Sequence, residues 1–219
     1  LIPVDFYKIA QSEPEVISFL LSQVNACLAG DRPATMDACR LVLIFKKGLR
    51  SDPSNWRPIN LTNAVFRICE SVIYRRLLGW SESVLSPNAF GFRPKRCAED
   101  VCYLLANHLH RAHRTRRPVH LLSLDIAKAF DTVPHDQLLL ALCRAGLSKV
   151  SVRIVAGMLT GHTCTVGDPS NPSRSFVVKI KRGVLQGGIL SPLLFNIFFD
   201  QSLLTSVPGI IPFSYADDV

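Results

Sequence analysis

The sequence predicts an α+β fold in which an antiparallel sheet has helices on one face. Stretches with helical and with strand-like apolar spacing alternate irregularly along the chain. The strand-like stretches 162–166 and 176–181 are spaced like the two arms of a hairpin, which favours antiparallel pairing. The chain has 219 residues, of which 48% are hydrophobic, so it can bury a sizeable core.

Helix and strand signals alternate in the N-terminal part of the chain. Residues 15–29 have apolar positions at helical spacing, and Gly30 is expected to end that helix. The short apolar run 40–45 predicts a strand, and the basic, turn-rich stretch 46–60 predicts a loop. Residues 61–79 have the pattern of a second amphipathic helix.

Proline and glycine recur within 86–97, which predicts a loop.

Further strands are expected at two apolar runs. The runs 119–126 and 210–215 have the composition of buried strands.

Helix boundaries are well marked in the second half of the chain. A helix over 98–113 begins with acidic residues and ends with basic ones, as the helix dipole favours. A helix over 134–145 has Pro134 early and Gly146 just past its end. Another begins at Ser191-Pro192 and runs to about residue 204.

Charge and cysteine content indicate the kind of partner and the compartment to expect for this protein. The net charge is +8, with 25 Lys and Arg against 17 Asp and Glu, so an acidic partner is expected, nucleic acid first. Seven cysteines form no CxxC pair and predict reduced, mostly buried thiols in an intracellular protein. No apolar run reaches the roughly 20 residues of a membrane helix. The chain starts without Met and stops abruptly, which is typical of a fragment.

Carboxylates close two of the predicted strands. Asp125 ends one apolar run, and the doublet Asp217 and Asp218 ends another. Adjacent like charges raise each other's pKa unless a cation lies between them, and Mg²⁺ prefers such oxygen ligands. Two ions about 3.5–4 Å apart can activate an attacking hydroxyl and stabilise a leaving oxygen. The doublet is therefore either a solvated turn or half of a metal site.

Several motifs, in order and at matching spacing, resemble those of reverse transcriptases, most closely the enzymes of non-LTR retrotransposons. The strings LLSLDIAKAFDTVPH, RGVLQGGILSPLLFNIFF and YADD are similar to motifs A, B and C. Upstream, RLVLIFKKG, NWRPINLT and AFGFRPKRCAED are similar to motifs of the fingers. The resemblance spans nearly the whole chain, and it implies an RNA-directed DNA polymerase.

The resemblance also implies an architecture and a set of partners. Residues 1–115 would form the fingers and 116–219 the palm of a right-hand polymerase, with an antiparallel palm sheet backed by helices. The thumb and other domains of the parent polyprotein would be absent, leaving the piece weak or inactive alone. The partners would be an RNA template, a DNA primer or target and deoxynucleoside triphosphates, in the nucleus if the element is eukaryotic.

The metal ligands follow from the same resemblance. It makes Asp125, Asp217 and Asp218 the catalytic carboxylates that hold two Mg²⁺ ions, with Mn²⁺ as an alternative. The backbone carbonyl of Ile126 would add a further ligand.

The resemblance also implies contacts with the sugar and base of the nucleotide. Phe130 falls where the family keeps a ring that would clash with a 2′-hydroxyl, although such a residue alone would be read as core. Gln186 and Gly187 would lie beside the incoming nucleotide and template base, although QGG alone is typical of a flexible turn.

The basic residues Lys46, Lys47 and Arg57 fall where the family clamps the triphosphate. Phe45 replaces the proline that often precedes the family's lysine, so either lysine is the counterpart.

Basic residues beyond the nucleotide site are candidates for contact with nucleic acid. Arg93, Lys95 and Arg96 could line a template or duplex track. The arginines near the end of the 98–113 helix are explained equally well by a solvated helix end.

Two other functions remain open at this stage. An RNA-dependent RNA polymerase shares the palm chemistry, but Phe130 and YADD, instead of a small polar gate and GDD, argue against it. A catalytically inactive nucleic-acid-binding remnant is the second, and the presence of all three carboxylates and Gln186 argues against it.

Overall fold

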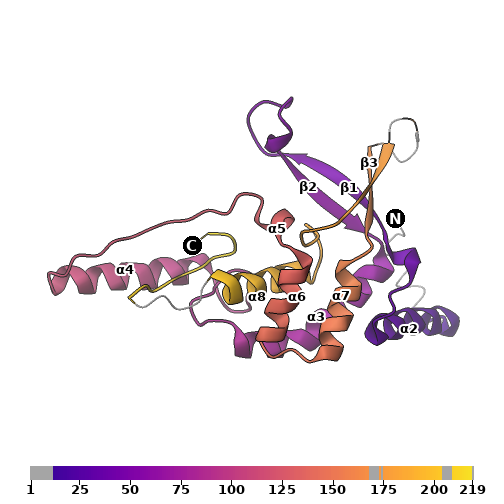
Figure 1. The fold of residues 1–219 in the computed structure, drawn as a ribbon, viewed down its shortest axis with the longest axis horizontal. Helices are drawn as coiled ribbons and strands as arrows, with labels where there is room; N and C mark the ends of the chain where they lie inside the picture. The colour runs from indigo at the N-terminus through magenta and orange to yellow at the C-terminus, as the bar shows by residue number, and fades with distance from the viewer. Residues whose placement is uncertain (1–11, 168–172, 174, 204–208, 219) are drawn as a thin grey trace.

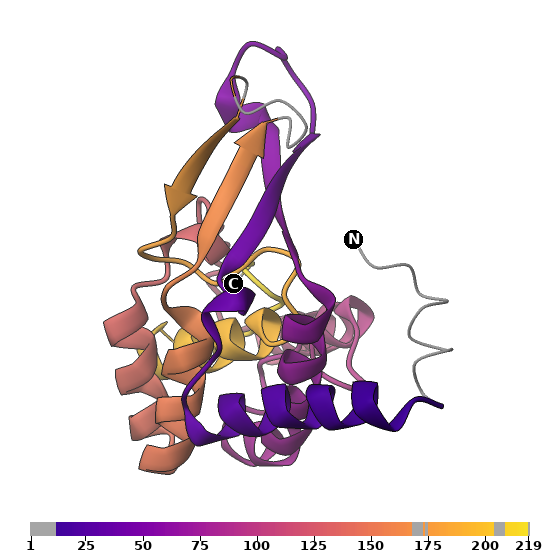
Figure 2. The same cartoon turned by 90° about the vertical axis from the view of Figure 1, so that its right-hand side faces the viewer.

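The computed structural model describes residues 12–167, 173, 175–203 and 209–218. A small sheet stands over a layer of helices, and helix α4 projects from one side (Figures 1 and 2). The predicted α+β class is confirmed. The helices are α2 (Pro14–Ala29), α3 (Ala64–Val84), α4 (Ala98–Arg114), α5 (Ala129–Thr132), α6 (His135–Arg144), α7 (Lys149–Leu159) and α8 (Ser191–Leu203), with 3₁₀ turns at Ala34–Met36 and Pro53–Asn55. The strands are β1 (Ala38–Phe45), β2 (Trp56–Thr62), β3 (Thr163–Gly167) and β4 (Ser175–Lys179).

The sheet has the strand order β2-β1-β3-β4. The predicted hairpin is confirmed, because β3 and β4 pair antiparallel, as do β1 and β2. The central pair β1–β3 is parallel, so the sheet is mixed and the expectation of a purely antiparallel sheet is corrected. Antiparallel neighbours can be joined by a short turn, whereas β1 and β3 are separated by a long crossover that includes most of the helices. The sheet also combines strands from both predicted regions, β1 and β2 from 1–115 and β3 and β4 from 116–219.

The two apolar runs expected as buried strands do not form a ladder. Residues 119–126 and 210–215 contribute only isolated bridges, Asp125 to Asp218, Tyr215 to Asp218 and Ser214 to Ala89. Their side chains are largely exposed, with Leu122 at 74%. A ladder needs several consecutive paired residues, and the described residues beside these runs provide only these single bridges.

Two elements were missed by the sequence analysis. Strand β2 lies where a loop was expected, because Arg57 and Pro58 obscure its alternation. Pro58 is tolerated because β2 is an edge strand. Helix α7 begins after Ser148, whose side chain accepts a hydrogen bond from the backbone of Ser151.

A disulfide joins β1 to β3, which corrects the expectation of reduced thiols for this pair. Cys39 and Cys164 are partners in the strand register, with Cα atoms 4.7 Å apart. Sequence spacing gives no sign of it, since 125 positions separate them. The other cysteines are free: Cys27 and Cys69, which are buried, and Cys97, Cys102 and Cys143, which are exposed.

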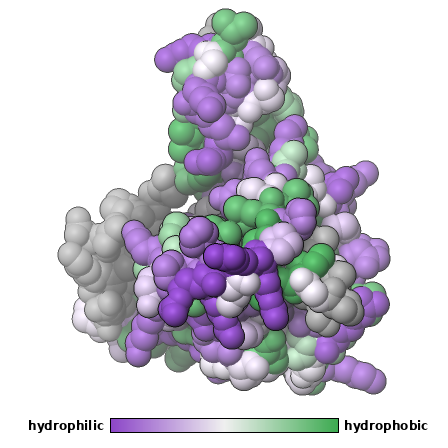
Figure 3. Space-filling model, turned by 90° about the vertical axis from the view of Figure 1, so that its left-hand side faces the viewer, coloured by the Kyte–Doolittle hydropathy of each residue, from purple (hydrophilic) through white to green (hydrophobic). Residues whose placement is uncertain are grey.

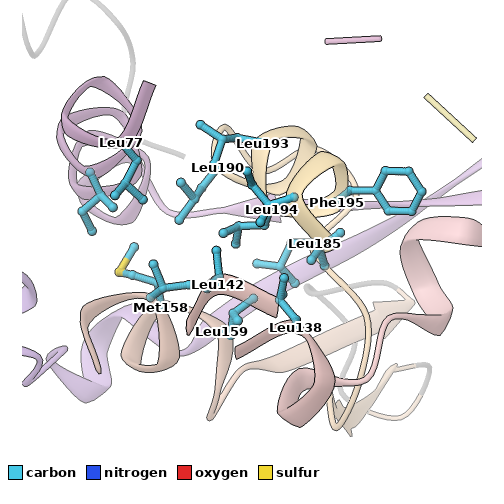
Figure 4. Packing of buried hydrophobic residues seen from close by; sticks show 14 of the residues in the cluster. Leu77, Leu138, Leu142, Met158, Leu159, Leu185, Leu190, Leu193, Leu194 and Phe195 are labelled. Atoms are coloured by element: carbon cyan, nitrogen blue, oxygen red, sulfur yellow. The ribbon is translucent and has the colours of Figure 1, made fainter. Parts of the chain in front are cut away.

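The core lies where α3, α6, α7 and α8 meet (Figure 4). Leu138 and Leu142 of α6 and Ile197 of α8 are fully buried. Figure 4 shows Leu77 of α3 above Met158 of α7, with both side chains beside the same leucine-rich cluster. This packing fixes α8 and the loop that leads into it, and both border the candidate site described below.

Replacement of a core leucine tests the weight of this packing. Leu142→Ala is expected to lower the free energy of unfolding by about 2–5 kcal/mol, because it removes buried methyl groups and leaves a cavity. Leu140→Ala, on the exposed side of the same helix, should change it by only about 0.5 kcal/mol. Urea unfolding of the purified variants measures both, and equal losses would contradict the assigned faces of α6.

Candidate active site

The YADD segment forms a two-residue turn. Tyr215 and Asp218 exchange backbone hydrogen bonds, with N–O distances of 2.9 and 3.2 Å. Ala216 has a φ of 58°, in the left-handed region that such turns require. Asp217 therefore lies within the turn and Asp218 on its return side.

Backbone hydrogen bonds hold this turn against the loop that precedes α4. The amide of Phe90 donates to the carbonyl of Ser214 at 2.8 Å, and the amide of Ser214 donates to the carbonyl of Asn88 at 3.0 Å. Ser214 is buried. The start of the turn is thus fixed by main-chain contacts and leaves its carboxylates free.

Gly91 allows the closest approach in this loop. A Cβ at position 91 would lie 2.1 Å from the backbone nitrogen of Ala216, so any larger residue would displace the turn. The Gly91 carbonyl accepts a hydrogen bond from the side-chain nitrogen Nδ2 of Asn196 on α8, at 2.6 Å. Neither residue was singled out from the sequence, although the glycine in AFGF was visible there.

Asp125 lies beside the turn. An isolated antiparallel bridge pairs Asp125 with Asp218, and Asp217 directly precedes Asp218 in the chain. Asp125 and Asp218 are exposed, and Asp217 is partly exposed. Among the described residues, no three His, Cys, Asp or Glu side chains converge closely enough to hold a metal ion. The backbone therefore brings the carboxylates into one neighbourhood, and their side chains would have to turn to reach a common ion.

Phe130 lies four residues beyond Ile126 and is anchored by aromatic packing. Its ring stacks on Phe195 of α8 at a centroid distance of 4.8 Å and meets Phe92 edge-on at 5.8 Å. Phe130 is only partly buried. The ring is thus held from beneath while part of it remains accessible.

The QGG loop is held from several elements. The side-chain nitrogen Nε2 of Gln186 donates to Asp131 at 2.7 Å, and the Gln186 carbonyl accepts from the amide of Asn60 at 2.7 Å. Arg67 of α3 donates to the Gly187 carbonyl at 3.2 Å. Gly187 has a φ of 101°, and a Cβ there would lie 3.0 Å from the Asn60 carbonyl oxygen, so glycine is required.

Glu70 of α3 supports the end of that loop from below. It is 3% exposed, and its carboxylate accepts from the amides of Ile189 and Leu190 at 3.3 and 3.4 Å. Burial raises the pKa of this carboxyl, and the two amides and Arg67 oppose the rise. Sequence reasoning missed Glu70, and its one signal was a carboxylate on the apolar side of a helix.

Lys46, Lys47 and Arg57 lie on the β1–β2 hairpin and are exposed. The Lys46 amide donates to Asn55 across the hairpin at 2.8 Å, and Arg57 lies opposite Ile44. Hydrogen bonds from Ser54 lower the pKa of Asp52 in the same hairpin, and Lys128 adds to the effect.

Arg93 has a structural role in this arrangement. It is 8% exposed and forms an ion pair with Glu82 at 2.9 Å, and it donates to the carbonyls of Ser86 and Ala89. Its donors are already engaged by these partners, which argues against contact between Arg93 and nucleic acid. Lys95 is exposed, and Arg96 lies over the Phe90 ring at 5.0 Å.

The basic end of α4 is solvated. Figure 3 shows hydrophilic side chains gathered on the face at which this helix ends. The arginines there are exposed: Arg111, Arg114, Arg116 and Arg117.

None of the helices in the described parts of the chain combines the length and apolarity needed to cross a bilayer.

Comparison with solved structures defines the class of fold. A chain of apo telomerase from Candida tropicalis, truncated from its C-terminal domain, superimposes with a TM-score of 0.61 over 84% of this chain and 43% of that one. Sequence identity is only 14%, so this likeness shows a shared fold and nothing further.

Comparison with sequence families identifies the chain. The family described as reverse transcriptase (RNA-dependent DNA polymerase) matches residues 44–219. The chain belongs to this reverse transcriptase family, as the motifs predicted.

Curated relatives are polyproteins and polymerases of mobile elements. The Retrovirus-related Pol polyprotein from type-1 retrotransposable element R2 of Popillia japonica is 36% identical over 186 residues, covering 84% of this chain and 26% of that protein. The RNA-directed DNA polymerase from mobile element jockey of Drosophila funebris is 26% identical over 215 residues, covering 94% and 23%. The chain thus spans about a quarter of the length of these two relatives.

The buried Glu70 predicts a pH dependence of stability. The pKa of Glu70 is raised in the folded state. Its contribution to the free energy of unfolding is therefore fully present below its ordinary pKa of 4.5, and it is lost as the pH rises through the raised pKa. The Glu70→Gln variant keeps an acceptor without this titration. Between about pH 4 and pH 7, the wild type should therefore lose stability relative to Glu70→Gln. Urea unfolding across this range tests the prediction, and a constant difference would contradict it.

Proposed function

We propose that the parent protein is an RNA-directed DNA polymerase of a non-LTR retrotransposon. The observation that carries the proposal is the backbone bridge between Asp125 and Asp218, which brings motif A beside motif C. The reaction is template-directed attack of a primer 3′-hydroxyl on the α-phosphate of a deoxynucleotide. Such a transfer depends chiefly on positioning and charge neutralisation.

The carboxylates fit a divalent cation by their chemistry. Asp125, Asp217 and Asp218, with the carbonyl of Ile126, offer the hard oxygen atoms that Mg²⁺ prefers. We assign them two Mg²⁺ ions, with Mn²⁺ as the alternative. When bound, such ions neutralise the charge that develops on the reacting oxygens.

Other residues bind and select the nucleotide. Lys46 or Lys47, with Arg57, reaches the triphosphate from the β1–β2 hairpin, which explains why these side chains are exposed. The anchored ring of Phe130 excludes a 2′-hydroxyl by size, while Gln186 and Gly187 lie beside the nucleotide and the template base.

The polymer partners are an RNA template and a DNA primer or target. Lys95 and Arg96 are the candidates for backbone contact, since the net charge of +8 favours polyanions. We keep 1–115 as fingers and 116–219 as palm, with the thumb and further domains supplied by the rest of the polyprotein. The curated relatives above come from insects, so we place this activity in the nucleus.

Removal of the metal ligands tests catalysis directly. In the full-length parent, Asp125→Ala and Asp217→Ala should each reduce Mg²⁺-dependent primer extension by at least about a hundredfold, because transition-state charge is no longer neutralised. Binding of template RNA should be retained. Unchanged extension would rule out the catalytic assignment, and a wild-type parent without activity would favour the inactive nucleic-acid-binding remnant.

Replacement of the Phe130 ring tests sugar selection. Phe130→Val should increase incorporation of ribonucleotides relative to deoxynucleotides by about tenfold or more, because space opens for the 2′-hydroxyl. Phe176→Val, on the exposed face of β4, is the matched control. Single-nucleotide insertion with each substrate measures the ratio. A wild type that prefers ribonucleotides would instead indicate an RNA-dependent RNA polymerase.

A further inference from the structure

Helix α5 and the loop before α8 are joined by hydrogen bonds along their length. The amide of Val184 donates to Phe130 and that of Gly183 donates to Val133, both at 2.8 Å. Gly183 lies so close to Asp131 that a Cβ would be 2.8 Å from its carbonyl oxygen. The metal-binding motif and the QGG loop therefore behave as one unit at this point.

The side-chain contact within this unit has a fixed polarity. Gln186 and Asp131 are joined at 2.7 Å, and neither is fully buried. An ionised carboxylate can only accept hydrogen bonds, so the nitrogen end of the Gln186 amide must face Asp131. The oxygen Oε1 is then the end of the amide that is left to accept from a ligand.

We propose that Asp131 is a positioning residue that fixes the amide of Gln186 so that Oε1 is presented to the nucleotide and template. This inference rests on the proposed function, because it assigns to Gln186 a place beside the substrate. Asp131 follows Phe130 directly, so α5 supplies both the ring under the sugar and the group that orients the glutamine. Without Asp131 the amide could rotate and offer a donor where an acceptor is needed.

A double-mutant cycle in the full-length parent separates this role from general support of the fold. Asp131→Ala should lower kcat/KM for deoxynucleotides by about tenfold to a hundredfold, as expected for loss of a hydrogen bond to a charged group. In a Gln186→Ala background the same change should have less than about a twofold effect, because the coupled partner is gone. Primer–template affinity of Asp131→Ala alone should stay within about twofold of the wild type, since Asp131 itself is not placed in contact with the polymer.

A polarity exchange provides the second arm. Gln186→Glu alone places two carboxylates in contact and should be strongly impaired. Adding Asp131→Asn restores a donor between the two positions and should recover activity by about tenfold over Gln186→Glu alone. Asp136→Asn, an exposed carboxylate in the first turn of α6, is the matched control and should match the wild type.

The outcomes distinguish this inference from the function on which it depends. Independent, multiplicative losses for Asp131→Ala and Gln186→Ala, or no recovery in the exchanged pair, would overturn the role of Asp131 while the wild type still polymerises. A wild-type parent that does not polymerise would overturn the proposed function itself and this inference with it.

Discussion

Main-chain hydrogen bonding at the YADD turn is the constraint on which the rest of the site depends. The turn closes on itself, is tied to the loop at 88–91, and pairs with Asp125. Because the backbone makes these contacts, the carboxylates of Asp217 and Asp218 need no structural partners. Glycine is essential at position 91 for this contact between the loop and the turn, since a side chain there would occupy the place of the Ala216 backbone.

Helix α8 connects the parts of the site to the core. Asn196 binds the carbonyl of Gly91 beneath the turn, and Phe195 stacks under Phe130. Glu70 of α3 holds the loop that leads into the helix. Ile197 on the same helix is fully buried, so the apolar core gives a rigid base to all of these contacts.

Local physical chemistry made much of the molecule predictable from sequence. Gly30 has the left-handed backbone that ends α2, and the acidic first turn of α4 and Pro134 before α6 mark helix starts within a residue or two. The hairpin at 162–181 follows from its spacing. The family follows from motifs such as YADD, because carboxylates, glycines and an aromatic ring recur in a fixed order.

The sequence by itself thus determined several helix ends, the fold class and the family, because these depend on neighbours along the chain or on the order of motifs. Only the tertiary structure decided that β1 and β3 run parallel and that residues 119–126 form no strand ladder. It also decided that Arg93 forms an ion pair with Glu82. It also decided that Asp131 meets Gln186, 55 positions away. Such pairings depend on which distant segments come into contact, and that is settled by burial and by satisfaction of hydrogen bonds across the whole chain.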